Sequence, residues 1–239
     1  MIEESRVLGA LSAVRDPELD EPITDLGFVK AVQIEGDAVA ITLWLPTFFC
    51  APNFAYMMAA DAKAAVGSLE GVGSCRVTLF DHYVSDEIDE GLAEEKGFDG
   101  TFASETAGTG LGDLRSLFDR KAFVSRQEQL YRSLLDAGTT LEQAARLRVR
   151  DLPDTPDARR YLERRERMGL DSSDDAPFLV TPAGKPISEG DIAQHMRFAR
   201  TVSVSIEGNA SLCRGLLAER YGNHSIKEVS REGGPLAQL

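Results

Sequence analysis

Two short segments of alternating apolar residues, joined by a tight turn, constrain the fold of this chain most strongly. Residues 28–34 and 39–45 are rich in β-branched and other apolar side chains, and the second segment alternates at the period of a strand. Between them lies Glu35-Gly36-Asp37, where the glycine suits a turn that needs a positive φ. The pattern predicts a β-hairpin with one face in a core.

Helical patterns surround this hairpin. Residues 3–14 carry apolar side chains at helical spacing and end before Pro17, which disfavours helical geometry at the residue before it. Residues 54–69 repeat the helical spacing, and residues 75–80 alternate again as a third strand. The order helix, hairpin, helix, strand predicts a small α+β domain, which we expect to span residues 1–96.

The rest of the chain has a different composition. Residues 97–112 are rich in glycine and small polar residues, which is typical of a flexible linker. Residues 113–239 show mostly helical patterns, with Thr140 and Gln143 as a capping box and Thr155 as the N-cap of a further helix. We therefore expect a mostly α-helical C-terminal region after the linker.

Charge and cysteine content exclude several classes of protein. Asp and Glu outnumber Lys and Arg by 39 to 26, and the resulting net charge of −13 argues against general nucleic-acid binding. No apolar run is long enough to span a membrane, and the acidic N-terminus differs from a signal peptide. The three widely spaced cysteines do not form a structural zinc motif. We expect a cytoplasmic protein with reduced thiols and with no nucleic-acid or membrane partner.

Cys50 is the strongest candidate for a reactive residue. It lies between the second predicted strand and the following helix, close to Pro52, where backbone amides and the helix dipole stabilise a thiolate. Thr47 can donate a hydroxyl hydrogen bond to its sulfur, and a thiolate is both a nucleophile and a soft ligand for iron. In the alternative interpretation Cys50 is a small buried apolar residue. Cys75, on the apolar face of the third strand, is expected to fill the core.

Three motifs occur in a recognisable order. They are D-P-E-L followed by D-L-G-F-V (residues 16–29), T-x-x-C (residues 47–50) and L-E-G-V-x-x-C-R-V-T-L (residues 69–79). In order and spacing they resemble the SufT- and PaaD-type iron–sulfur cluster assembly family over residues 1–82. That family usually has proline directly after its cysteine, whereas Ala51 stands between Cys50 and Pro52 here.

The resemblance implies a function as well as a fold. Asp16, Glu18, Leu19, Thr47 and Cys50 would form a shared surface patch. The chain would be a non-catalytic accessory factor for iron–sulfur cluster assembly or metalloenzyme maturation. Cys50 would handle iron or an iron–sulfur cluster transiently, as a metal ligand, and the partners would be a client metalloenzyme or other assembly proteins.

Three alternatives stay open. In the first, the chain is a maturation factor dedicated to one iron-dependent (di-iron) oxygenase. In the second, it is a thiol enzyme that uses Cys50 with His82 as the base. In the third, it is a DNA-binding regulator that uses the arginines of residues 146–167. Interleaved Glu163 and Glu166 favour a salt-bridged solvated face for those arginines over a DNA-binding surface. No catalytic triad, phosphate loop or H-E-x-x-H motif is present, so we expect no enzyme. The C-terminal helices are expected to provide client specificity or self-association as a homo-oligomer.

Overall fold

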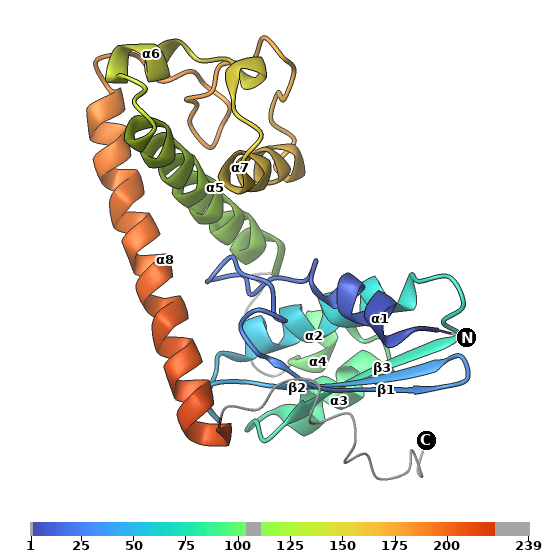
Figure 1. The fold of residues 1–239 in the computed structure, drawn as a ribbon. Helices are drawn as coiled ribbons and strands as arrows, with labels where there is room; N and C mark the ends of the chain where they lie inside the picture. The colour runs from blue at the N-terminus through green and yellow to red at the C-terminus, as the bar shows by residue number, and fades with distance from the viewer. Residues whose placement is uncertain (1, 104–110, 223–239) are drawn as a thin grey trace. The chain divides into compact units, whose positions relative to one another are not determined.

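The computed structural model describes residues 2–103 and 111–222. The chain divides into two compact units: unit 1 comprises Met1–Leu114 with Asn209–Leu239, and unit 2 comprises Arg115–Gly208. The long helix α8 (Ile192–Tyr221) contributes its first part to unit 2 and its last part to unit 1 (Figure 1). Each unit is described by itself below.

Unit 1 is built on a three-stranded sheet with helices packed against it. It confirms the predicted α+β class and the order helix, hairpin, helix, strand. The elements in chain order are α1 (Glu4–Leu11), β1 (Val29–Glu35), β2 (Ala38–Trp44), α2 (Pro52–Gly67), β3 (Ser74–Phe80), α3 (Ser85–Ala93) and α4 (Gly97–Thr101) (Figure 1).

The sheet has the strand order β1-β2-β3 and combines two kinds of pairing. β1 and β2 form the predicted antiparallel hairpin, with Ile34 opposite Val39 and Gly36 at a φ of +64° in the turn. β2 and β3 are parallel, and their last residues, Trp44 and Phe80, are register partners. A parallel pair needs a crossover connection, which α2 supplies. The segments that follow β2 and β3 therefore leave the sheet at the same edge.

The core of unit 1 lies on one face of this sheet. Val39, Ile41 and Leu43 alternate along β2 and are buried, as the sequence pattern predicts. Val7 and Leu11 of α1 belong to the same apolar cluster. Each fully buried aliphatic side chain of this kind contributes about 1.5–3 kcal/mol relative to an exposed one, so the hairpin and the helices stabilise one another.

The first part of the expected linker, residues 97–112, packs against unit 1. Phe98 and Phe102 lie one helical turn apart and contact Tyr56 of α2, with ring-centroid distances of 5.4 and 6.5 Å. Two aromatic side chains on one helix face offset the unfavourable helix propensity of the glycines around them. Residues 104–110 of the expected linker lie outside the described residues.

Unit 2 consists mainly of helices around a second core, which confirms the mostly helical C-terminal region. Thr140 and Gln143 form the predicted capping box, and Thr155 caps the next helix by accepting a hydrogen bond from the Ala158 amide. The elements are α5 (Leu111–Asp136), which begins in unit 1, α6 (Leu141–Arg146), a short 3₁₀ helix (Val149–Asp151), α7 (Pro156–Arg167) and the first part of α8.

Part of the arginine-rich segment is buried, so the prediction of a solvated face is wrong for Arg165, which is 1% exposed. Its guanidinium donates hydrogen bonds to the carbonyls of Asp171 at 2.6 Å and Pro177 at 2.8 Å, and to the Tyr161 hydroxyl at 2.8 Å. That hydroxyl in turn donates to the Phe178 carbonyl at 2.6 Å. Arg165 therefore holds the segment after α7, since buried backbone carbonyls need donors.

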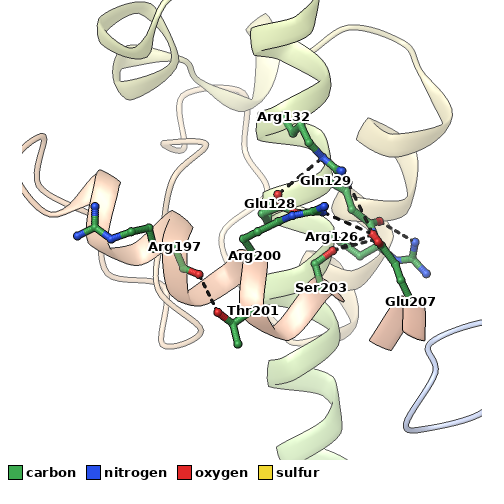
Figure 2. Close-up of polar contacts among 9 residues, drawn as sticks. All are labelled: Arg126, Glu128, Gln129, Arg132, Arg197, Arg200, Thr201, Ser203 and Glu207. Atoms are coloured by element: carbon green, nitrogen blue, oxygen red, sulfur yellow. Dashed lines mark hydrogen bonds and ion pairs between the residues drawn. The ribbon is translucent and has the colours of Figure 1, made fainter. Parts of the chain in front are cut away.

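A charged cluster joins α5 to the first part of α8 within unit 2 (Figure 2). The buried Glu128 carboxylate lies 3.7 Å from Arg132 Nε and 3.8 Å from Arg200 Nη1. Glu207 lies 3.6 and 3.9 Å from the same two arginines and accepts a hydrogen bond from the Ser203 hydroxyl at 3.1 Å. The two cations balance a carboxylate that would be costly to bury alone.

The packing of α4 on α3 yields a test that compares two identical substitutions. A Cβ added at Gly91 of α3 would lie 2.8 Å from the Thr101 Cβ, whereas one at Gly9 of α1 would meet no atom within 4 Å. We expect Gly91→Ala to destabilise unit 1 by about 1–3 kcal/mol through overpacking. Gly9→Ala should be neutral or stabilise α1 by up to about 1 kcal/mol through helix propensity.

Urea unfolding followed by the fluorescence of Trp44, the single tryptophan of the chain, reports on unit 1 and measures both variants. Equal midpoints for the two variants would show that α4 does not pack on α3.

Candidate functional site

Cys50 lies in the loop that connects the end of β2 to the start of α2. Pro52 occupies the first position of α2, with Ala51 as its N-cap. The Cys50 amide donates to the Thr47 carbonyl at 3.4 Å, and the Thr47 hydroxyl oxygen lies 3.3 Å from the Cys50 sulfur. The Cys50 side chain is half-buried. The structure thus brings together the two residues expected from the T-x-x-C motif, with the thiol partly open to solvent.

His82 holds this loop from the neighbouring strand. It follows β3, which ends at the same edge of the sheet as β2, and its Nε2 lies 2.8 Å from the Cys50 carbonyl oxygen. Burial lowers the pKa of the His82 imidazole, so the ring is neutral at pH 7 and its Nε2 donates the hydrogen bond. The imidazole is 3% exposed, and its Nδ1 has no hydrogen-bond partner among the described residues. In the described chain the ring bonds the backbone of Cys50 and not its sulfur, so a role as base for the thiol is not supported by this geometry.

Asp16 organises the acidic loop before the hairpin. Its Oδ1 accepts hydrogen bonds from the amides of Glu18 and Leu19, each at 2.8 Å, and its own amide donates to the Glu21 carbonyl at 2.9 Å. The side chain is 6% exposed, and burial raises the pKa of the Asp16 carboxyl to about 6, although the two amides act in the opposite direction. The hydrogen bonds of Asp16 therefore fix the conformation of this loop.

The expected patch residues divide into two groups. Cys50 and Thr47 meet in one loop, while Glu18 is half-buried and shares the acidic loop with Asp16. Leu19 is 1% exposed and belongs to the core of unit 1, so its side chain is not part of a surface and only its amide supports the loop.

Exposed aromatic side chains lie beside the Cys50 loop. Phe48 and Phe49 precede Cys50, and Tyr83 follows His82; their exposed fractions are 40%, 75% and 43%. The ring centroids of Phe49 and Tyr83 are 5.7 Å apart, and those of Phe48 and Phe49 are 5.0 Å apart. An exposed group of large apolar side chains is typical of an interaction surface. We name Phe48, Phe49 and Tyr83 the aromatic surface.

The last part of α8 packs on unit 1 through one helical face. Ala210 and Leu217 belong to the core of unit 1, and a Cβ added at Gly27 would meet Leu217 Cδ2 at 3.3 Å. The Tyr221 ring stacks on the ring of Trp44, with 4.4 Å between centroids and 13° between planes. The spacing of 210, 217 and 221 follows the helical repeat, so a single stripe of α8 makes these contacts.

Polar contacts also hold the first residues of this part of α8. Asn209 Nδ2 donates to Glu18 Oε1 at 3.4 Å, and Arg214 forms an ion pair with Glu21. These two contacts tie the helix to the acidic loop.

At its C-terminal end, α8 contacts the two segments that flank Cys50. Arg220 donates to the carbonyl of Leu45 at 3.2 Å and to both the carbonyl and the carboxylate of Asp81 at 2.7 Å. Leu45 precedes the Cys50 loop and Asp81 precedes His82, so one arginine connects the ends of both segments.

Cys213 is a residue that sequence reasoning missed. It lies on the same stripe of α8, is half-buried and packs against the core of unit 1. Burial, followed by the negative charges of Asp16, Cys50 and Glu18, raises the pKa of the Cys213 thiol to about 11. The one signal in the sequence is the spacing of 210, 213, 217 and 221, which marks a helix face but does not say what that face covers.

The site does not contain a complete metal centre. Within residues 2–103 and 111–222, no group of three or more His, Cys, Asp or Glu side chains is placed to hold a metal ion. No described helix is both long and apolar enough to cross a membrane.

Comparisons with known proteins match the N-terminal part of the chain. Residues 4–79 match the family model described as iron–sulfur cluster assembly protein. The uncharacterized protein MJ1129 of Methanocaldococcus jannaschii is 35% identical to this chain over 97 residues, which is 40% of this chain and 100% of that protein. No solved structure matches.

The raised pKa of Asp16 predicts how the stability of unit 1 depends on pH. Because the folded state binds this proton more tightly than the unfolded state, the free energy of unfolding should fall as pH rises from about 4 to about 6. Asp16→Asn keeps an acceptor oxygen for the amides of Glu18 and Leu19 and removes the charge. Over this pH range the free energy of unfolding of Asp16→Asn should rise by up to about 3 kcal/mol relative to that of wild type, because the pKa of the Asp16 carboxyl is raised by about 2.

Urea unfolding at several pH values, read from Trp44 fluorescence, measures this difference. Asp16→Ala is the matched control, because it also removes the charge but leaves two amides without an acceptor. It should be less stable than Asp16→Asn by about 1–3 kcal/mol at every pH. If the difference in free energy of unfolding between wild type and Asp16→Asn did not change with pH, this would contradict the raised pKa of the buried Asp16 carboxyl.

Proposed function

Because the chain belongs to the iron–sulfur cluster assembly protein family through residues 4–79, we propose that it is a non-catalytic accessory factor that acts through its Cys50 loop. It takes part in iron–sulfur cluster assembly and assists the maturation of a client metalloenzyme. The single observation that carries the proposal is a half-buried thiol, partly open to solvent, in a loop held in place by other residues.

The chemistry of the loop supports this role. A cysteine sulfur is a soft ligand that suits iron and iron–sulfur clusters. Thr47 reaches the Cys50 sulfur with its hydroxyl, and His82 holds the Cys50 carbonyl. These contacts restrict the loop while part of the thiol stays accessible, which suits a residue that must receive and release cargo.

The proposed partners are a client metalloenzyme or other assembly proteins. The aromatic surface lies directly before Cys50 and directly after His82, so a protein that binds it would also approach the thiol. Such a partner would supply the ligands that the described residues lack.

Unit 2 is the proposed source of client specificity. Its residues, Arg115–Gly208, lie outside the matched residues 4–79 and have their own apolar core. A unit added to a family domain is a natural place for features that distinguish one client from another, because function resides in sites added to a fold. We propose no nucleic-acid partner for it, and one of its arginines, Arg165, is occupied by backbone carbonyls.

Complementation tests the role of Cys50. In a strain from which the gene has been deleted, wild type and Cys75→Ser should restore the activities of the affected iron–sulfur or iron-dependent enzymes. Cys50→Ser should leave these activities at the level of the deletion strain, because the soft ligand is lost. A panel of enzymes is assayed, and a defect restricted to an iron-dependent oxygenase would identify a dedicated maturation factor.

Cys75→Ser is the matched control because Cys75 is also a half-buried cysteine of unit 1 but lies on β3. Trp44 fluorescence must show that both variants fold to the same extent. Full restoration by a folded Cys50→Ser variant would refute the proposed function.

A further inference from the structure

One outer edge of the sheet in unit 1 is β3, which pairs with β2 on one side only. In a parallel ladder the amide and carbonyl of one residue point to the same side, and the side alternates along the strand. The Ser74 amide donates to the carbonyl of Asp37, directly before β2, at 3.3 Å. The Leu79 amide points away from β2 and donates to Asp89 Oδ1 of α3 at 3.0 Å. Every second residue from Leu79 back along β3 therefore directs its backbone polar groups outward.

Cys75 and Val77 are outward residues whose backbone has no partner on that side. Within the described ranges 2–103 and 111–222, no hydrogen bond uses the outward amide or carbonyl of either residue. Cys75 is half-buried and Val77 is 2% exposed, so these groups have little contact with bulk water. Unpaired backbone groups at a buried position are unfavourable, and another strand laid along β3 would pair them.

A groove follows this part of the edge. A cavity of about 220 Å³ is lined by residues 74–77 of β3 and by Asp89, Leu92 and Ala93 of α3. A second cavity, of about 460 Å³, lies between α2 and α3 and shares Cys75 and Leu92 with the first. The two cavities therefore adjoin beside the free part of the edge. Because α3 flanks the groove, a single extended chain fits it better than the edge strand of another folded domain.

The charges at the groove favour an acidic occupant. Arg76 lies between the two outward residues and is exposed, and its guanidinium forms no ion pair or hydrogen bond with any described residue. Lys63 also lines both cavities, but its Nζ donates to the Leu92 carbonyl at 2.6 Å and lies 3.7 Å from Glu95. Opposite charges that face each other across neighbouring strands stabilise their pairing. Arg76 is thus the cation that a carboxylate of an added strand would meet.

We propose that the edge of β3 at Cys75 and Val77 is a docking site for an extended, acidic segment of a partner protein. The segment lies between β3 and α3 as a fourth strand, and its backbone pairs with the outward amides and carbonyls. A carboxylate on one side of the segment meets Arg76, and the side chains on its other side face the cavities beside Leu92. The backbone provides affinity, and Arg76 selects acidic segments.

This docking site is separate from the Cys50 loop. Cys75 lies near the start of β3, whereas the Cys50 loop follows Trp44, the register partner of Phe80 at the end of β3. Cys75 and Phe80 are about 17 Å apart along the strand, at about 3.3 Å per residue. A bound segment therefore leaves the Cys50 thiol accessible, and docking here does not depend on the chemistry proposed for that thiol.

A short fluorescein-labelled peptide in which valine and glutamate alternate is a suitable probe, because it is extended and acidic. In fluorescence polarisation, wild type should bind it at least tenfold more tightly than a peptide with lysine in place of glutamate. Arg76→Glu should reverse this preference. Cys50→Ser should bind the acidic peptide like wild type. Absence of binding to wild type, or an unchanged preference in Arg76→Glu, would overturn the docking site.

The role of the backbone is tested by removing hydrogen-bond donors. Cys75→Pro removes one outward amide, which an edge strand tolerates, and should weaken binding of the acidic peptide at least tenfold. Cys75→Ser keeps the amide and is the matched control. Urea unfolding read from Trp44 fluorescence verifies that both variants fold. Equal affinities of wild type and folded Cys75→Pro would count against strand addition.

Modified peptides repeat this test on the wild-type protein. Two versions of the acidic peptide are N-methylated, one at every valine and the other at every glutamate, which blocks the amides on one side of the strand or on the other. One version should bind like the unmodified peptide and the other should lose binding at least tenfold. If both bind like the unmodified peptide, side chains alone make the contact and the proposal is wrong.

Hydrogen exchange locates the bound peptide. Addition of the acidic peptide should slow exchange of the Cys75 and Val77 amides and leave residues 47–50 unchanged. Protection at residues 47–50 instead would place the peptide at the Cys50 loop and refute docking at β3. Sedimentation without peptide tests the other occupant of the edge. A wild-type dimer that Cys75→Pro converts to a monomer would show that a second copy of this chain, and not a partner segment, pairs with β3.

Discussion

The parallel pairing of β2 and β3 is the constraint on which the site depends. Parallel neighbours must be joined by a crossover, here α2, and both strands end at the same edge of the sheet. The loop that carries Cys50 and the turn that carries His82 therefore start from register partners, Trp44 and Phe80. A hydrogen bond from one segment to the backbone of the other follows directly from this topology. An antiparallel third strand would place the histidine at the opposite end of the sheet, away from the thiol loop.

Local patterns were sufficient to predict the elements of the family domain, because strands and helices there follow simple apolar periodicities. The contact between Thr47 and Cys50 was also predictable, because two residues three positions apart in one tight loop lie close together under almost any geometry. Cys213 was not, because helical spacing indicates that a face is apolar but not which surface it covers. Phe98 and Phe102 were overlooked for a related reason. The glycines around them indicated a linker, whereas the structure shows both aromatic rings in contact with Tyr56 of α2.

The arginines of α7 show a second limit of composition. Clustered cations with interleaved glutamates usually indicate solvated charge, yet Arg165 is among the most buried side chains of the chain. It is tolerated there because backbone carbonyls and a tyrosine hydroxyl use its donors. Because hydrogen bonds within the protein can use all the N–H groups of a buried arginine, a basic stretch of sequence need not form a basic surface. In this chain, counting charges along the sequence overestimates the cationic area of unit 2.

Unit 1 is discontinuous in sequence, and this has a consequence for the order of events during synthesis. The sheet and the Cys50 loop are encoded in the first third of the chain, whereas the part of α8 that packs on unit 1 begins only at Asn209. At about 5–20 residues per second, the ribosome makes the helix on the order of 10 s or more after the loop. During that interval Trp44 and Gly27 are without the side chains that cover them in the finished structure. The nascent chain therefore passes through a stage in which the Cys50 loop and the acidic loop are present but the last part of α8 does not yet contact them.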